Sequence, residues 1–181
     1  MRRRTTLIAL CVATAALPQP ALARDERSWD HASSIGRDVL VVAALAVPAA
    51  KGDWRGDIQA GESMGAAVLV TGGLKELLPE WRPDRSDRKS FPSGHTSASF
   101  AAAASLQNRY GWKIGIPAQM VAAFVGLSRV EARKHHWYDV VAGAAIGEGA
   151  GFLLTSRRHE NVRILPWGGT DGAGVAVAMR F

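Results

Sequence analysis

The chain contains one cysteine in 181 residues, Cys11, so it cannot form an internal disulfide or a zinc site built on cysteine ligands. Aromatic residues are also scarce, at 7% of the chain, while alanine and glycine dominate its apolar class. Small residues permit close packing of helices and cannot fill a bulky β-sandwich core. No stretch after the first 23 residues reaches the roughly 18 uninterrupted apolar residues that predict a membrane-spanning helix. These absences favour an all-α fold.

The overall composition is that of a globular protein with one ordinary domain. Hydrophobic residues make up 48% of the chain and charged residues 21%, which excludes a disordered chain. The formal net charge is +6, from 22 basic and 16 acidic residues. Three of the arginines lie together near the N-terminus, so part of this positive charge comes from one short segment.

The first 23 residues have the pattern of a secretory signal peptide. Residues 2–4 are all arginine, Leu7–Leu17 is an apolar run, and Ala21-Leu22-Ala23 is a small-residue cleavage site. We expect cleavage and export to the periplasm; an uncleaved anchor in the inner membrane is the alternative. Cleavage would remove three basic residues and no acidic one. The remaining positive charge is too small to indicate a nucleic-acid partner.

Five apolar stretches of 13 to 16 residues follow. Their length and alanine content predict helices, because normal strands are shorter. Charged residues inside two of them favour a compact soluble bundle of about five to six helices. The alternative is a membrane-embedded bundle in which the N-terminal apolar run is kept as the first of six helices. The stretches are Ile35–Ala50, Ser63–Leu78, His95–Gln107, Trp112–Leu127 and Val140–Thr155.

The segments between these stretches are expected to be loops. Lys51–Asp57 and Leu78–Pro92 are rich in polar or turn-forming residues, and Asn108–Gly111 predicts a short turn. The helical domain is therefore expected over 24–161.

The tail, residues 162–181, has a different pattern. Val175, Val177, Met179 and Phe181 alternate with smaller or polar residues, which is the period of a strand. We expect a short C-terminal β-hairpin or an extended tail. A strand that targets the chain to an outer membrane is a weaker alternative, because one or two strands cannot close a barrel.

Three polar clusters stand where a helical bundle would not require them. Each has an ordinary explanation on its own, such as a solvated helix end, a helix cap or a surface pair at i, i+4. The clusters are Lys75 with Arg82-Pro83 after six residues, Pro92-Ser93-Gly94-His95, and Ser128-Arg129 followed after five residues by His135 and after three more by Asp139.

Taken together, the clusters indicate an oxyanion site. Lys75, Arg82 and Arg129 are cations in or beside apolar segments, and they would gather only around an anion such as phosphate. Ser93 and Gly94 open a predicted helix, whose free backbone N–H groups favour the same ligand.

Two histidines stand beside these anion-binding residues. His135 can serve as nucleophile or base, and Asp139, four residues on, can orient its ring. His95, at a predicted helix start, can serve as general acid.

The clusters resemble the three-part motif of the type 2 phosphatidic acid phosphatase family, K-x6-R-P, P-S-G-H and S-R-x5-H-x3-D. Every motif position is intact between Lys75 and Asp139. Bacterial class A acid phosphatases, membrane lipid phosphatases and vanadium haloperoxidases share this motif. The resemblance implies an all-α core and a phosphatase acting on phosphomonoesters, lipid phosphates or lipid diphosphates.

The resemblance also implies a role for each residue. His135 would attack phosphorus and form a phosphohistidine, Asp139 would orient His135, and His95 would protonate the leaving oxygen and then activate water. No metal or other cofactor is expected, since cations of the chain would stabilise the charge. His136 and His159 are expected to be structural or surface residues. The phosphate-binding residues would be Lys75, Arg82, Ser93, Gly94 and Arg129.

Two alternatives to a phosphatase remain at this stage. The fold could serve a vanadate-dependent haloperoxidase or a non-catalytic phosphate-binding protein, although retention of both histidines and the aspartate favours hydrolysis. The seven residues Asp84–Ser90 between the first two clusters predict a shallow, open site. Soluble helices would suit a small phosphate ester as substrate. Tryptophans near the segment ends suit a bilayer surface, which would favour a lipid-linked phosphate ester. The pattern carries no sign of an oligomeric state.

Overall fold

The computed structural model describes residues 26–158, 162–169 and 172–179. The expected signal peptide and His159 lie outside these ranges. Five α-helices are followed by two strands, as the sequence predicts. They are α1 (Glu26–Ala50), α2 (Trp54–Leu77), α3 (Gly94–Tyr110), α4 (Trp112–Glu131), α5 (Trp137–Leu154), β1 (Val162–Gly169) and β2 (Gly172–Met179).

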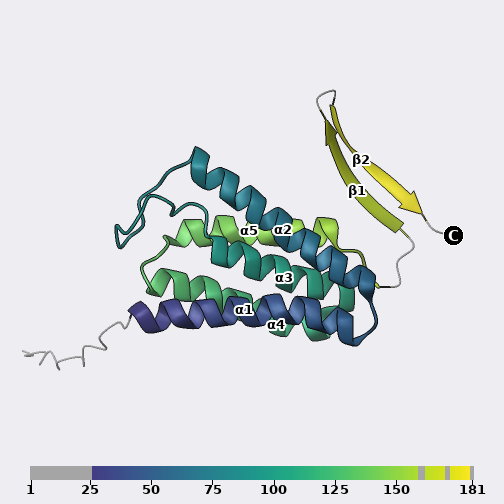
Figure 1. Ribbon diagram of the computed structural model, residues 1–181, viewed down its shortest axis with the longest axis horizontal. Helices are drawn as coiled ribbons and strands as arrows, with labels where there is room; N and C mark the ends of the chain where they lie inside the picture. The colour runs from purple at the N-terminus through teal and green to yellow at the C-terminus, as the bar shows by residue number, and fades with distance from the viewer. Residues whose placement is uncertain (1–25, 159–161, 170–171, 180–181) are drawn as a thin grey trace, which may run out of the picture.

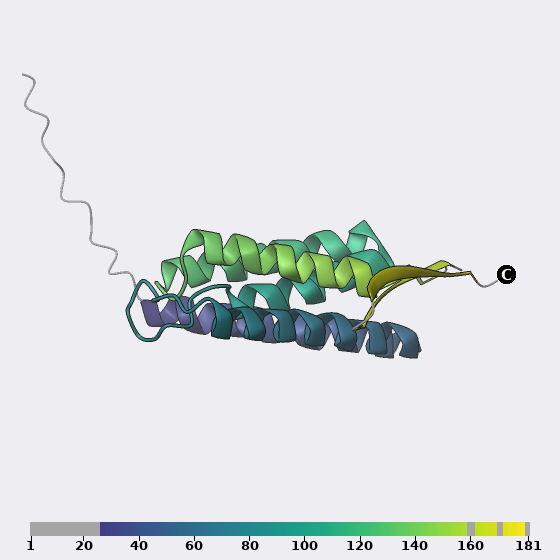
Figure 2. The same ribbon diagram turned by 90° about the horizontal axis from the view of Figure 1, so that it is seen from above.

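Helix α3 is the centre of the bundle (Figures 1 and 2). It contacts all four other helices, which form a ring around it because α1 packs on α2 and α4, and α5 packs on α2 and α4. This position explains why four consecutive alanines of α3, residues 101–104, are all completely buried. Only small side chains fit where a helix is surrounded on every side.

Most helices extend further than the apolar stretches. The expected loop Lys51–Asp57 is shorter than predicted, because α2 already begins at Trp54. Asp53 caps it, with its Oδ1 accepting a hydrogen bond from the Gly56 backbone N–H at 3.2 Å. The expected turn Asn108–Gly111 is likewise reduced to Gly111, whose φ of +81° separates α3 from α4. The long loop after α2 is confirmed.

Close contact between α3 and α5 rests on glycines spaced four residues apart. A Cβ on Gly143 would lie 2.5 Å from the backbone oxygen of Ser93, and one on Gly147 would overlap the Ser97 oxygen and lie 2.8 Å from the Ala101 nitrogen. Backbone atoms cannot move aside as a flexible side chain can. Gly143 and Gly147 therefore determine how closely α5 approaches the backbone of α3.

We expect Gly147→Ala to lower stability by about 1–3 kcal/mol, because the added methyl group must push α5 away from α3. Gly149 is the matched control on the same helix, since a Cβ there meets nothing within 4 Å. Gly149→Ala should be neutral or mildly stabilising, by up to about 1 kcal/mol of helix propensity. Thermal unfolding of the two variants in detergent compares them. Equal melting temperatures would refute this account of the packing.

Large apolar side chains point outward, which is the reverse of a water-soluble bundle. The core consists mainly of alanine, serine and glycine. A soluble bundle, as expected from the sequence, would instead bury its large apolar side chains. Among the described residues one helix, α1, is long and apolar enough to cross a membrane. The exposed residues include Val39, Val42, Val68, Leu69, Ile116, Met120, Leu127, Val141 and Leu153.

The two strands form an antiparallel hairpin in which Val162 pairs with Met179 and Gly169 with Gly172. This is the hairpin alternative of the sequence prediction. The hairpin extends from the bundle at the end where α5 finishes, and β1 contacts α5 (Figure 1).

Candidate active site

All three polar clusters lie at one end of the bundle. Helices α2 and α4 end there, α3 and α5 begin there, and the long loop 78–93 folds over the same end (Figure 1). The alternating directions of neighbouring helices therefore bring residues from 75 to 139 together. The roles of these residues remain predictions, but their proximity is a feature of the structure.

His135 and Asp139 form a buried pair. Nδ1 of His135 lies 3.6 Å from Oδ2 of Asp139, and the two side chains are 2% and 0% exposed. The predicted placement on one helix face is wrong in detail, because His135 precedes the helix. His136 occupies the N-cap position of α5, and Asp139 reaches back from the third helical position to that cap.

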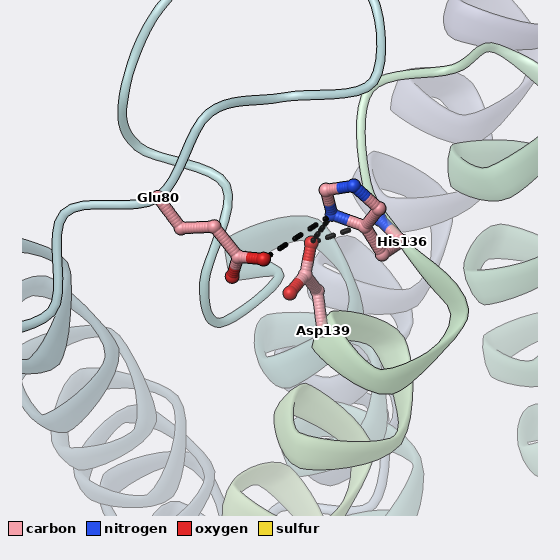
Figure 3. A group of neighbouring side chains, drawn as sticks. All are labelled: Glu80, His136 and Asp139. Atoms are coloured by element: carbon pink, nitrogen blue, oxygen red, sulfur yellow. Dashed lines mark hydrogen bonds and ion pairs between the residues drawn. The ribbon is translucent and has the colours of Figure 1, made fainter.

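Asp139 is held in place by groups that the motif does not include. Its Oδ2 accepts hydrogen bonds from the Ser90 hydroxyl at 2.6 Å and from the His136 backbone N–H at 2.8 Å. Figure 3 shows that the His136 ring turns its Nδ1 toward both Asp139 and Glu80, at 3.3 and 3.6 Å from their oxygens. His136, which we expected to be a structural or surface residue, therefore contacts the predicted site.

Glu80, His136 and Asp139 also have ligand atoms within 4.8 Å of one another, close enough to hold a metal ion. The Asp139 oxygen involved is fully buried and already accepts two hydrogen bonds. A metal ion would have to displace these donors. We therefore interpret the cluster as a support that fixes Asp139.

The contact with Arg82 determines which ring nitrogen of His135 is free to react. Arg82 NH1 lies 3.3 Å from His135 Nε2. A guanidinium can only donate, so Nε2 is the acceptor and the ring proton of the neutral histidine is on Nδ1, facing Asp139. Nε2 therefore carries the lone pair, which accepts a hydrogen bond from Arg82 while no substrate is bound. Arg82 is itself held by Asp87 Oδ1 at 2.7 Å and the Lys134 carbonyl at 3.1 Å.

Burial, together with the positive charges of Arg82, Arg129 and Lys75, lowers the pKa of His135 to about 4 against the opposing effect of Asp139. The ring is therefore neutral, and its Nε2 nucleophilic, at all pH values well above 4. The same effect shows that all three predicted phosphate-binding cations act on His135.

Lys75 secures the chain entering α3. Its ammonium donates to the backbone oxygens of Lys89 at 2.7 Å and Pro92 at 2.5 Å. Its Cε lies 3.9 Å from where a Cβ on Gly94 would be, so its head lies at the N-terminus of α3.

Ser93 and Gly94 stand at the start of α3, where Ser93 is fully buried. The Ser93 hydroxyl does not cap the helix; it accepts from Thr96 Oγ1 at 2.9 Å, and the Ser93 N–H donates to the Asp139 carbonyl at 3.0 Å. At Gly94 an added Cβ would meet only ordinary contacts at 3.8 and 3.9 Å. Packing therefore does not require the glycine, which is consistent with a backbone kept open for a ligand.

Helix α1 adds polar contacts that the three clusters did not predict. Arg129 NH1 donates to Asp30 Oδ1 and, at 3.0 Å, to the Ser33 hydroxyl. His95 Nε2 lies 3.0 Å from Arg37 NH1 and 3.3 Å from the Ser34 hydroxyl. The only sequence signal is helical spacing of polar residues at 30, 33, 34 and 37, within a segment that otherwise resembles an apolar helix.

Comparison with known sequences agrees with this site. The PAP2 superfamily pattern matches residues 58–163, more than half of the chain. The chain is 38% identical over 76 residues to the lipid A 4'-phosphatase of Helicobacter pylori, covering 42% of this chain and 38% of that protein. It is 42% identical over 94 residues to lipid phosphate phosphatase 2 of Arabidopsis thaliana, covering 44% and 30%. The chain thus matches well under half the length of these relatives.

Solved structures confirm the fold. The crystal structure of Aquifex aeolicus LpxE superposes with a TM-score of 0.60 at 22% identity, covering 74% of this chain and 84% of that one. A transmembrane PAP2-type phosphatidylglycerolphosphate phosphatase of Bacillus subtilis superposes with a TM-score of 0.56 at 24% identity, covering 76% and 77%. The intact motif, its convergence at one end of a helical bundle and these matches lead to one conclusion: the chain belongs to the PAP2 superfamily.

Proposed function

We propose that this protein is a metal-independent phosphatase that hydrolyses lipid phosphate esters through a phosphohistidine intermediate. The observation that carries the proposal is the pair of contacts that His135 makes: its Nδ1 lies 3.6 Å from Asp139 Oδ2, and its Nε2 lies 3.3 Å from Arg82 NH1. A neutral imidazole that is oriented by a carboxylate and set among cations is suited to attack a phosphate.

In the first step His135 Nε2 forms a bond to phosphorus and the bond from phosphorus to the leaving oxygen breaks. Asp139 stabilises the positive charge that develops on the ring through Nδ1–H. His95 gives its proton to the leaving oxygen, which departs as an alcohol. Lys75, Arg82 and Arg129 hold the remaining phosphate oxygens, as metal ions do in other phosphoryl-transfer sites.

In the second step His95, now without that proton, takes one from water. The water oxygen attacks phosphorus, the bond from phosphorus to Nε2 breaks, and inorganic phosphate leaves. His135 returns to its neutral form and His95 to its protonated form, so the cycle balances.

A lipid substrate is supported by the outer surface of the bundle. The helices are 17 to 25 residues long, with α3 the shortest; at 1.5 Å per residue α3 spans about 26 Å, close to the ~30 Å of a bilayer core. Exposed tryptophans mark both ends: Trp54 and Trp112 begin helices at the far end, and Trp81 and Trp137 lie at the site end. Tryptophan is enriched at both membrane interfaces.

These features support a location in a membrane, with the site at one interface. Relatives named lipid A phosphatase and lipid phosphate phosphatase support a substrate that reaches the site from lipid. With the secretory pattern of residues 1–23, we propose that the site faces the periplasm.

The purified protein in detergent micelles should release inorganic phosphate from phosphatidic acid at a rate unchanged by dialysis against a chelator. Orthovanadate should inhibit, because it imitates the five-coordinate transition state. Loss of activity on chelation, restored by Mg²⁺ or Zn²⁺, would overturn metal independence and make Glu80, His136 and Asp139 a metal site. No phosphate release under any of these conditions would overturn the proposed function itself.

A further inference from the structure

Helix α1 presents one polar face to the site, although it lies before the region that matches the superfamily, which begins at residue 58. Asp30, Ser33, Ser34 and Arg37 recur at three- and four-residue intervals and therefore share a face of the helix. The two ends of this face contact different residues of the site. Asp30 and Ser33 hold Arg129, whereas Ser34 and Arg37 contact His95.

The contact between Arg37 and His95 cannot persist through the reaction. Arg37 NH1 lies 3.0 Å from His95 Nε2, and a guanidinium only donates, so this nitrogen carries no proton in the empty site. A histidine that gives up a proton as general acid must first hold protons on both ring nitrogens, since imidazolate does not form in proteins. Arg37 must therefore leave Nε2, and Nε2 must take up a proton from water, before His95 can act as an acid; this proton returns to water when the site empties and Arg37 returns.

Arg37 is free to make that movement. Its side chain is 31% exposed, against 4% for Arg129, so it borders both His95 and solvent. It is attached on its outer side to Asp38, with Nε–Oδ1 at 2.9 Å and NH2–Oδ1 at 2.7 Å, and Asp38 is 63% exposed. Such a surface ion pair is weak. Because Asp38 attracts it only weakly, the Arg37 guanidinium would leave His95 when an anion is bound in the site.

The position of Arg37 indicates which part of the substrate supplies that anion. His95 protonates the leaving oxygen, so a group in contact with His95 lies on the leaving side of the phosphorus. On the attacking side the arginine in contact is a different one, because Arg82 NH1 lies 3.3 Å from His135 Nε2. An anionic group near Arg37 therefore belongs to the departing part of the substrate, for example the inner phosphate of a lipid diphosphate.

Resting on the function proposed above, we propose that Arg37 is a specificity-determining residue that binds an anionic group on the leaving part of the substrate, and that it rests on Nε2 of His95 when the site is empty. A substrate with an uncharged leaving group would not make this contact. Arg37 would then favour lipid diphosphates over lipid monophosphates.

The test compares dodecyl diphosphate with dodecyl phosphate, two substrates that share one alkyl chain. Arg37→Gln should lower kcat/KM for the diphosphate about 30-fold, within the range for a lost charge-assisted hydrogen bond, and change it less than about 3-fold for the monophosphate. Arg37→Lys should retain part of the preference, because it keeps the charge and loses the fork. Arg88→Gln is the control, since Arg88 is an exposed arginine at the same end that lies over the Trp81 ring.

An equal loss with both substrates, or a larger loss with the monophosphate, would overturn the proposal, because a residue that only positions His95 matters most for the poorer leaving group. Inhibition by methylenediphosphonate gives a measure that does not depend on turnover. This compound should bind more weakly to Arg37→Gln by a similar factor, while phosphate binds both proteins alike. Unchanged inhibition would also count against Arg37. Wild-type protein that hydrolyses neither dodecyl ester would instead refute the function proposed above.

Discussion

Replacing His135 by alanine should lower phosphatase activity by at least about 10³-fold, the loss expected when a covalent nucleophile is removed. His135 is buried against Asp139, and its Nε2 is the nitrogen that faces the surrounding cations. Neither of its partners can replace it, because arginine is always protonated and Asp139 is fully buried with one oxygen already bonded twice. The rate of phosphate release from phosphatidic acid measures the effect.

His31 offers the matched control, since it is an exposed histidine on α1. His31→Ala should keep wild-type activity, and both variants should unfold near the wild-type temperature. Activity of the His135 variant within tenfold of wild type would contradict the assignment of the nucleophile.

Replacing His95 by alanine should slow alkyl phosphate hydrolysis far more than formation of the phosphoenzyme from an aryl phosphate. An alkoxide is a strong base and needs the proton in the transition state, whereas p-nitrophenolate leaves without help. We expect a loss of about 10²–10⁴-fold for the alkyl substrate, the usual contribution of general acid catalysis. Rapid-quench measurement of the first turnover with each substrate separates the two.

Asp139→Asn provides the comparison, because it acts on the nucleophile rather than on the leaving group. An asparagine in place of the carboxylate removes the charge that stabilises the phosphorylated ring, so both substrates should slow by the same factor. Equal slowing of both substrates by His95→Ala would remove the basis for assigning it as the acid.

The motif predicted which residues come together better than it predicted their surroundings. Motif spacing identified residues from Lys75 to Asp139, and helix directions bring them together at one end of the bundle. It did not predict Ser90, His136 or the polar face of α1. Contacts such as Ser90–Asp139 and Arg37–His95 join residues 49 and 58 positions apart, and only the packed bundle determines that they meet.

The fold shows a similar division. Length and alanine content predicted the helices, and strand periodicity predicted the tail. The orientation of the apolar residues was not predicted, because hydropathy summed over a stretch does not say which face turns inward. The small residues decided it: Gly143 and Gly147 allow α5 to approach the α3 backbone, which leaves the larger side chains on the outside.

Trapping the intermediate tests the central claim most directly. The protein is mixed with phosphate-labelled p-nitrophenyl phosphate and quenched, and the labelled residue is mapped under conditions that preserve phosphohistidine. His95→Ala is the variant to use, because it should form the intermediate from this substrate and hydrolyse it slowly. The account predicts label on His135 and none in a His95→Ala, His135→Ala double variant. Label on any other residue, or steady turnover by the wild-type enzyme without a trapped intermediate in either protein, would contradict it.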